Sequence, residues 1–231
     1  MLRAGEIRKI VRCAISSLTP NGIAEMAIPS YLHWNRAVRW IIRQRLQLIA
    51  NLLKQKDVRS FLDFGCGLGI LCEEMANSCT EIYAADLFLG PARTLIRMRG
   101  LRNVQAVEVS RLDASIPKQS LDSVVAADVL EHVDDVVKYL TLFSRLLKPD
   151  GILCLSGPTE NVIYKLCRAI VGFKGDYHVR NVYNIEDAIR EMNWKQEGLI
   201  EIPAFSPLKL FRISIWQRPE VASNQSSHQS S

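Results

Sequence analysis

The chain has 231 residues, of which 48% are hydrophobic and 23% charged, and its formal net charge is +5. This composition excludes a disordered chain, whose apolar content would be too low for a core, and the length suits a single α/β domain. The modest positive charge is compatible with an anionic partner, but a solvated basic helix face explains it as well.

The N-terminal quarter predicts two helices ahead of the first strand. A short basic helix opens the chain, and a turn-rich connector with Pro20 and Pro29 follows. From about residue 30 to 56, apolar residues recur at helical spacing, which predicts a long amphipathic helix. We expect the basic residues of this quarter on solvated faces: Arg3, Arg8, Lys9, Arg12, Arg36, Arg39, Arg43 and Arg45.

Strand and helix patterns then alternate, which is typical of βαβ units and a parallel sheet. Strands are predicted at 60–64, 82–85, 104–109, 123–127 and 152–156, and helices at 70–77, 91–99 and 136–147. Pro149 and Gly151 block continuation of the last helix and turn the chain into the next strand.

The C-terminal third predicts two helices and then two strand-like runs. The helices are expected at 162–171 and 185–192, and the runs at 197–202 and 210–216. The two runs are expected to form an antiparallel pair at one edge of the sheet.

Three parts are therefore expected: an N-terminal helical extension at 1–56, a Rossmann-like domain at 57–218 and a disordered tail, rich in Ser and Gln, at 219–231. No apolar run reaches the ~18 residues of a membrane-spanning helix, and no secretory signal is evident. The six cysteines form no CxxC pair, so no metal site is expected. Reduced cysteines inside strands and helices fit a cytoplasmic protein.

The most informative segment is a glycine loop. The strand at 60–64 runs directly into Gly65-Cys66-Gly67-Leu68-Gly69, and a helix follows. Glycine permits a tight turn and lets a ligand approach the backbone, and the amides of the following helix start favour an anionic group. A dinucleotide fingerprint needs its third glycine at the position of Ile70, so the spacing argues against a pyrophosphate-binding loop.

Acidic residues follow the second and third predicted strands. Asp86 lies about 20 residues past the glycines, the distance at which a Rossmann acid binds ribose hydroxyls. Asp113 follows the third strand and is a candidate neighbour of an adenine ring. An exposed acid with no ligand role is the alternative at both positions.

Together these motifs resemble the class I S-adenosylmethionine-dependent methyltransferases, especially the type 11/12-like group with a VLEHV segment, here residues 129–133. The resemblance covers roughly residues 60 to 158. It implies an α/β, Rossmann-like fold, in which a seven-stranded, mostly parallel sheet has an antiparallel last strand and helices on both faces. It also implies S-adenosyl-L-methionine as the cofactor.

The resemblance further implies a cofactor site with four parts. The glycine loop contributes Asp63, Gly65, Cys66, Gly67 and Gly69; the ribose-binding acid is Asp86, with Leu87 beside the adenine; Asp113 and Ala114 contact the adenine edge; Ala127 and Asp128 lie near the reactive end.

A general base is optional for this chemistry, because an amine or an acidic phenol needs little help whereas an alcohol benefits from one. His132 and His178 are the candidate bases, and packing at the start of the next helix is the alternative for His132. The segment 161–173 is apolar with spaced cations. A substrate lid, peripheral contact with a lipid surface and an ordinary packing helix all fit it.

The expected function is therefore methyl transfer to a small molecule, lipid or saccharide. No nucleic-acid partner is expected, because the sequence contains no aromatic-rich RNA-binding platform. A catalytically silent cofactor-binding or scaffolding protein is the alternative, and it would need the same glycine and acid positions. A nicotinamide-dependent dehydrogenase is disfavoured by Ile70. The acceptor, the methylated atom and the oligomeric state stay open.

Overall fold

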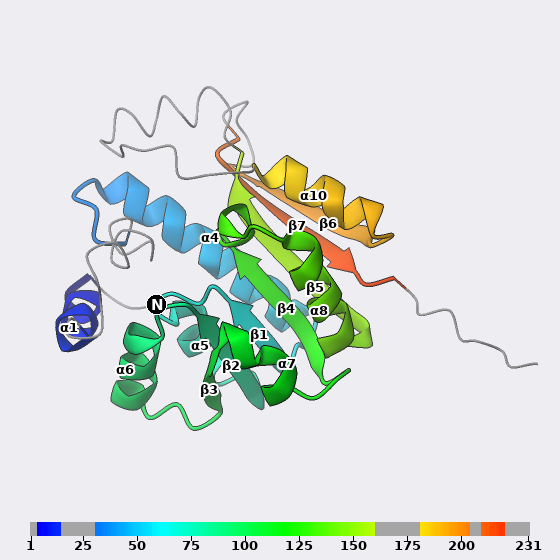
Figure 1. Ribbon diagram of the computed structural model, residues 1–231. Helices are drawn as coiled ribbons and strands as arrows, with labels where there is room; N and C mark the ends of the chain where they lie inside the picture. Colours follow the sequence, from blue (N-terminus) through cyan, green and yellow to red (C-terminus); the bar gives the residue numbers. More distant parts are fainter. Residues whose placement is uncertain (1–3, 15–30, 160–180, 204–208, 220–231) are drawn as a thin grey trace, which may run out of the picture.

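Seven strands form one sheet in the order β3-β2-β1-β4-β5-β7-β6 (Figure 1). The computed structural model describes residues 4–14, 31–159, 181–203 and 209–219. The strands are β1 (Ser60–Phe64), β2 (Glu81–Asp86), β3 (Val104–Glu108), β4 (Leu121–Ala127), β5 (Leu147–Pro158), β6 (Lys195–Ile202) and β7 (Phe211–Gln217). Strands β1 to β5 pair in parallel, whereas β7 is antiparallel to both β5 and β6. The predicted seven-stranded, mostly parallel sheet with an antiparallel pair at one edge is confirmed.

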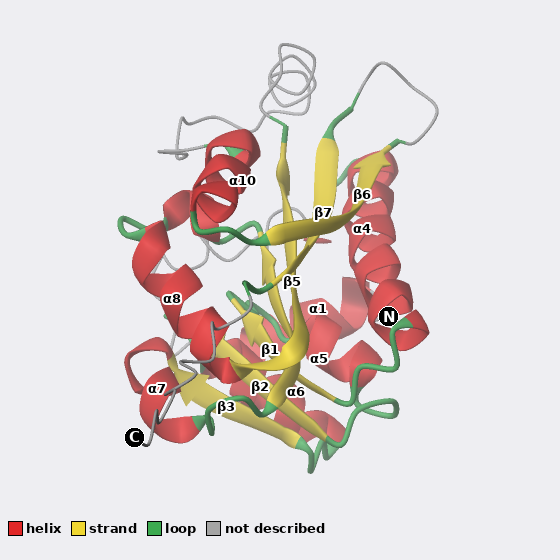
Figure 2. Cartoon of the chain, turned by 90° about the vertical axis from the view of Figure 1, so that its right-hand side faces the viewer, coloured by secondary structure: helices red, strands yellow, loops and turns green. Residues whose placement is uncertain are grey.

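Helices cover both faces of the sheet, as Figure 2 shows with α4 on one side and α8 and α10 on the other. The α-helices are α1 (Ala4–Ala14), α4 (Arg36–Gln55), α5 (Ile70–Met75), α6 (Gly90–Arg99), α7 (Leu112–Ser115), α8 (Val136–Leu146) and α10 (Val182–Glu191). Two short 3-10 helices are η2 (Val109–Arg111) and η3 (Leu130–His132). In the described part of the chain, no helix has the length and hydrophobicity needed to cross a bilayer.

Two apolar clusters, one on each face, form the core. Phe61 of β1 packs in the cluster that contains α4, α5 and α6, whereas Leu62 and Phe64 pack in the cluster that contains α8 and α10. This division follows from the geometry of a strand, in which successive side chains point to opposite faces. All five residues of β1 are buried, as expected for a central parallel strand covered on both faces.

Most observed elements lie within three residues of the predicted bounds, and the larger departures include β5 and the short helices. Strand β5 begins at Leu147, five residues earlier than expected, because Leu147 already pairs with Leu121. The register then shifts, and Ile152 pairs with Ser123, so the predicted turn forms an irregularity inside the strand. The short helices η2, α7 and η3 were not predicted, since one turn leaves no periodic pattern. The helix predicted at 162–171 and the tail from 220 lie outside the described residues, and the three-part organisation stays a prediction.

A buried ion-pair network fastens α10 to the antiparallel strands. Glu186 of α10 is 0% exposed and accepts a hydrogen bond from Arg212 Nε of β7 at 2.9 Å. The same guanidinium group contacts Glu201 of β6 at 3.1 Å. Removing one partner from such a network leaves a buried charge without its counter-ion, and this lowers the free energy of unfolding.

We therefore expect Glu186→Gln to lower the free energy of unfolding by roughly 2 to 3 kcal/mol, because it removes the buried negative charge that faces Arg212. Asp187→Asn is the matched control on the same helix: this carboxylate is 63% exposed and pairs with Arg190. Its loss is expected to cost less than about 1 kcal/mol. Urea titrations of both variants measure the difference, and equal losses would contradict the prediction.

Candidate functional site

The predicted site residues converge at the carboxyl edge of the sheet, where β1 lies between β2 and β4. The strand order reverses at this point, since the chain proceeds from β1 to β2 and β3 on one side and to β4 and β5 on the other. The amides of Gly65 and Cys66 donate hydrogen bonds to the carbonyl of Ala85, at 2.8 and 3.0 Å. The glycine loop therefore turns over the end of β2, at the position where open α/β sheets bind ligands.

The glycine loop needs its glycines for two different reasons. A Cβ on Gly65 would lie 2.6 Å from side-chain atoms of Val129, so this glycine permits close packing against the loop after β4. Gly67 has φ +53°, and a Cβ there would meet no atom within 4 Å. The backbone at Gly67 therefore faces open space, which is the property that a ligand-binding loop requires.

Asp86, at the end of β2, holds this loop in place. Its Oδ2 accepts a hydrogen bond from the Gly67 amide at 2.8 Å, and its Oδ1 accepts one from the Phe88 amide at 2.9 Å. A carboxylate that ends the second strand beside a glycine loop is the type of group that accepts hydrogen bonds from ribose hydroxyls. The neighbouring Leu87 is 79% exposed, and it provides an apolar surface beside the loop.

Asp63 lies beneath the loop rather than on its surface. It is 4% exposed, and the Cys72 thiol of α5 donates a hydrogen bond to it at 3.4 Å. Burial raises the pKa of Asp63 to about 7, and the charge of Asp86 adds to this effect. Burial also raises the pKa of the Cys66 and Cys72 thiols well above the usual value, so both stay protonated.

An ion pair that the sequence did not predict connects α4 with the end of β4. Arg45 pairs with Asp128 and lies over the Phe211 ring of β7, with 4.8 Å between its guanidinium carbon and the ring centroid. Arg45 is 3% exposed, so the expectation that it belongs to a solvated basic face is wrong. Among the described residues, Arg45 Nε and Asp128 Oδ1 are buried without a hydrogen-bond partner.

Tyr31 is a second site residue that the sequence did not reveal. Burial raises the pKa of Tyr31 to about 12; the charge of Arg45 opposes this shift, and the charges of Asp128 and Asp63 add to it. The phenol therefore lies close enough to Arg45, Asp128 and Asp63 to interact with their charges. Because it keeps its proton at neutral pH, it is a hydrogen-bond donor and not a base.

The remaining predicted residues lie less centrally. Asp113 is exposed on α7 and pairs with Arg145 of α8 at 2.9 Å, and Ala114 beside it is also exposed. Ala127 is half-buried at the end of β4. His132 is exposed at the end of η3, where its amide donates to the carbonyl of Val129 at 3.0 Å. His178 and the segment 161–173 lie outside the described residues.

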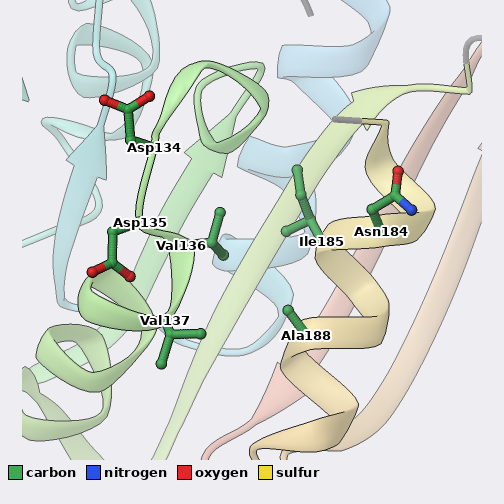
Figure 3. Close-up of a pocket in the computed structure, with 7 residues that line it drawn as sticks. All are labelled: Asp134, Asp135, Val136, Val137, Asn184, Ile185 and Ala188. Atoms are coloured by element: carbon green, nitrogen blue, oxygen red, sulfur yellow. The ribbon is translucent and has the colours of Figure 1, made fainter. Parts of the chain in front are cut away.

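A separate cavity of about 180 Å³ lies between the start of α8 and α10 (Figure 3). Val136, Ile185 and Ala188 are among the residues that line it, and polar groups stand at its rim. Two of these groups cap helices: Asp135 accepts from the Lys138 amide at 2.9 Å, and Asn184 belongs to the capping box of α10. The cavity is smaller than typical ligand pockets of roughly 300 to 1,000 Å³, and none of the predicted cofactor residues lines it.

Replacing Asp63 with Asn is expected to flatten the pH dependence of stability. The folded chain holds a proton on Asp63 up to a pKa of about 7, whereas an unfolded aspartate releases it near ~3.9. For the chain with Asp63 unchanged, the free energy of unfolding should therefore fall by roughly 4 kcal/mol as the pH rises from about 4 to above 7.

Urea titrations of the ligand-free chain at about pH 4 and about pH 8 measure this fall. Asp57→Asn is the control, since the Asp57 side chain is 78% exposed. An unchanged slope in the Asp63→Asn chain would show that another group is responsible.

Known proteins share both this fold and parts of the sequence. A ubiquinone biosynthesis O-methyltransferase from Rhodopseudomonas palustris (strain TIE-1) is 34% identical over 110 residues, covering 43% of this chain and 40% of that protein. The protein of the same name from Histophilus somni (strain 2336) is 31% identical over 135 residues, covering 55% of each chain. The chain thus matches about half of the length of these curated relatives.

Solved structures extend the similarity over nearly the whole fold. The N-methyltransferase NodS from Bradyrhizobium japonicum WM9, in complex with S-adenosyl-L-homocysteine, matches with a TM-score of 0.63 at 18% identity, covering 92% of this chain and 98% of that one. The magnesium protoporphyrin IX methyltransferase from Synechocystis PCC 6803 matches with a TM-score of 0.64 at 18% identity, covering 92% and 100%. The sequence profile of the family described as "Methyltransferase domain" matches residues 33–197, which is most of the chain, and the protein belongs to this family.

Proposed function

We propose that the chain binds S-adenosyl-L-methionine at the glycine loop and transfers its methyl group to a small molecule, lipid or saccharide. The observation that carries this proposal is the open backbone at Gly67, held by Asp86 at the reversal of the strand order. Membership of the methyltransferase domain family supports it. So does the S-adenosyl-L-homocysteine bound to both structural neighbours.

The proposed cofactor position follows from the places of the predicted residues. The ribose hydroxyls would donate to Asp86, and the methionine part would lie along the backbone from Gly65 to Gly69. Leu87 would cover one side of the adenine, a role that accounts for its exposure of 79%. The turn containing Asp113 and Ala114 would flank the adenine edge through its backbone, since the Asp113 carboxylate is engaged by Arg145.

The chain's contribution to catalysis would be chiefly positioning. S-adenosyl-L-methionine supplies a methyl group already activated by a sulfonium centre. The protein must then orient the acceptor in line with this group and exclude water, and orientation contributes up to ~7 to 11 kcal/mol in favourable cases. Ala127, Asp128, Arg45 and Tyr31 are the residues that we place around the reactive end.

A general base, where one is needed, has few candidates among the described residues. Tyr31 is excluded by its pKa of about 12. His132 stays the proposed base because it follows β4 at the same edge, although its exposure means that an acceptor would have to cover it. His178 stays a second candidate from the sequence.

The relatives favour oxygen as the methylated atom, since the curated ones are named O-methyltransferases. The structural neighbours include an N-methyltransferase, so the fold by itself does not select the atom. The catalytically silent alternative predicts cofactor binding without turnover, and nothing in the site favours it. Cytoplasmic location stays a prediction, in keeping with the buried free thiols of Cys66, Cys72 and Cys154.

Cofactor binding is expected to depend on Asp86 and Gly67. Asp86→Ala removes the acceptor of the Gly67 amide, and Gly67→Arg fills the open space above the loop in a backbone conformation that side chains rarely adopt. Each change should weaken S-adenosyl-L-homocysteine binding at least about 100-fold, which corresponds to roughly 3 kcal/mol. Isothermal titration calorimetry measures the affinity, and thermal unfolding with each compound reports the same effect.

Asp150→Asn is the control, because this exposed acid lies at the amino edge of the strands. NAD serves as the control ligand and should not raise the melting temperature. Stabilisation by NAD, or no uptake of S-adenosyl-L-methionine and S-adenosyl-L-homocysteine by folded native protein, would contradict the proposed function. Uptake without turnover over a broad acceptor panel would favour the silent alternative.

The Arg45–Asp128 ion pair is expected to position the reactive end. Arg45→Met should cost about 3 kcal/mol of stability, because it leaves the Asp128 carboxylate without its cation. The double variant Arg45→Met/Asp128→Asn should regain part of this stability, since both charges are gone. Its affinity for S-adenosyl-L-homocysteine should stay about tenfold weaker, because the carboxylate is missing.

Calorimetry and urea titrations on the single and double variants separate these two effects. Arg36→Met, which removes an exposed arginine from the same helix, is the control. Recovery of native affinity in the double variant would show that the pair only stabilises the fold.

A further inference from the structure

The amino end of α4 presents an unusual surface. Trp40 is 58% exposed, and Trp34, just before the helix, is 77% exposed. The other two tryptophans of the chain, Trp194 and Trp216, are 4% and 0% exposed. Tryptophan is enriched at surfaces that contact another phase or molecule, so two exposed indoles near one helix end indicate a candidate contact surface.

Arginines flank Trp40 on the same face of the helix. Arg36 precedes it by four residues and Arg43 follows it by three, and residues at these spacings are neighbours on a helix surface. We call Trp34, Arg36, Trp40 and Arg43 the Trp–Arg stripe. The buried face of α4 starts only at Ile42 and points away from it.

The charge of this region has one sign. No Asp or Glu occurs between Met26 and Lys56. On the same helix, Arg39 donates to the carbonyl of Trp34 at 3.1 Å and Arg45 pairs with Asp128. The stripe therefore combines indoles with arginines on a helix that carries no acid of its own.

The stripe lies on the side of the molecule where the candidate site opens. Arg45 contacts the residue that follows β4, and nine residues of α4 precede it, from Arg36 to Gln44. At about 1.5 Å per residue they extend about 13 Å past that contact. Figure 1 shows this blue amino end of α4 reaching away from the strands.

We propose that the Trp–Arg stripe binds the surface of an anionic lipid bilayer and places the carboxyl edge of the sheet against it. Interfacial helices use this combination, since indoles insert at the headgroup level while arginines bind lipid phosphates. Single-stranded RNA fits the shape less well, because it prefers a charged groove and the stripe is a convex helix face. The inference does not depend on methyl transfer.

Co-sedimentation with vesicles tests the proposal. The native chain should bind mixed phosphatidylcholine–phosphatidylglycerol vesicles at low salt, bind pure phosphatidylcholine vesicles weakly, and be released by salt. Tryptophan emission should shift to the blue on binding, because Trp34 and Trp40 are the exposed indoles. Trp34→Ser/Trp40→Ser and Arg36→Glu/Arg43→Glu should each lower the partition coefficient about tenfold or more.

The matched control is Arg102→Glu/Lys118→Glu, which changes the net charge equally at the opposite edge, before β3 and β4. It should bind vesicles nearly as well as the native chain. All variants should retain native affinity for S-adenosyl-L-homocysteine, so failure here is distinct from failure of the proposed function.

Two results would overturn the proposal. The first is no vesicle binding at low salt; retention on single-stranded RNA, or a dimer that the Trp34→Ser/Trp40→Ser chain no longer forms, would then identify the occupant of the stripe instead. The second is an equal loss in the control, which would show that net charge alone acts.

Discussion

The pairing of β1 with β2 on one side and β4 on the other is the constraint on which the site depends. Because the chain leaves β1 toward β2 and later returns to β4, the loops after these strands diverge and leave room between them. Gly65 allows the first loop to pack against Val129 of the second, where a Cβ would lie 2.6 Å from that side chain. The reversal of the strand order thus leaves space above Gly67, and the missing side chain of Gly65 lets the two loops pack beside that space.

Much of this arrangement could be predicted because its signals are local. Strand β1 begins and ends where expected, since a short apolar run meets three alternating glycines. The place of Asp86 at the end of β2 was also expected, because the apolar run before it ends there. The antiparallel pair at the edge was also correct, because its two runs are separated by too few residues for a crossover. The start of β5 was missed, since the Pro–Gly turn does not prevent Leu147 from pairing with Leu121.

Tyr31 and Arg45 could not be recognised because their partners are distant in sequence. Asp128 lies 83 residues from Arg45, and no local pattern indicates that they meet. One signal was available: Arg45 shares the helical phase of Ile42 and Ile49, so it occupies the apolar face of α4. A charged residue on a buried face needs a partner of opposite charge, which the end of a strand can provide. The same limit applies to Asp113, because no local pattern in the sequence indicates that it pairs with Arg145.

Asp63, Asp86 and Asp128 lie at the carboxyl ends of the adjacent strands β1, β2 and β4, and their surroundings give them different properties. Asp63 is buried beneath the loop with a pKa of about 7, Asp86 accepts hydrogen bonds from two amides, and Asp128 pairs with Arg45. The loops after β2 and β4 thus each carry an acidic side chain, Asp86 and Asp128, and Arg45 pairs with the second of them. This surplus of negative charge suits a ligand with a permanent positive charge, such as the sulfonium of S-adenosyl-L-methionine.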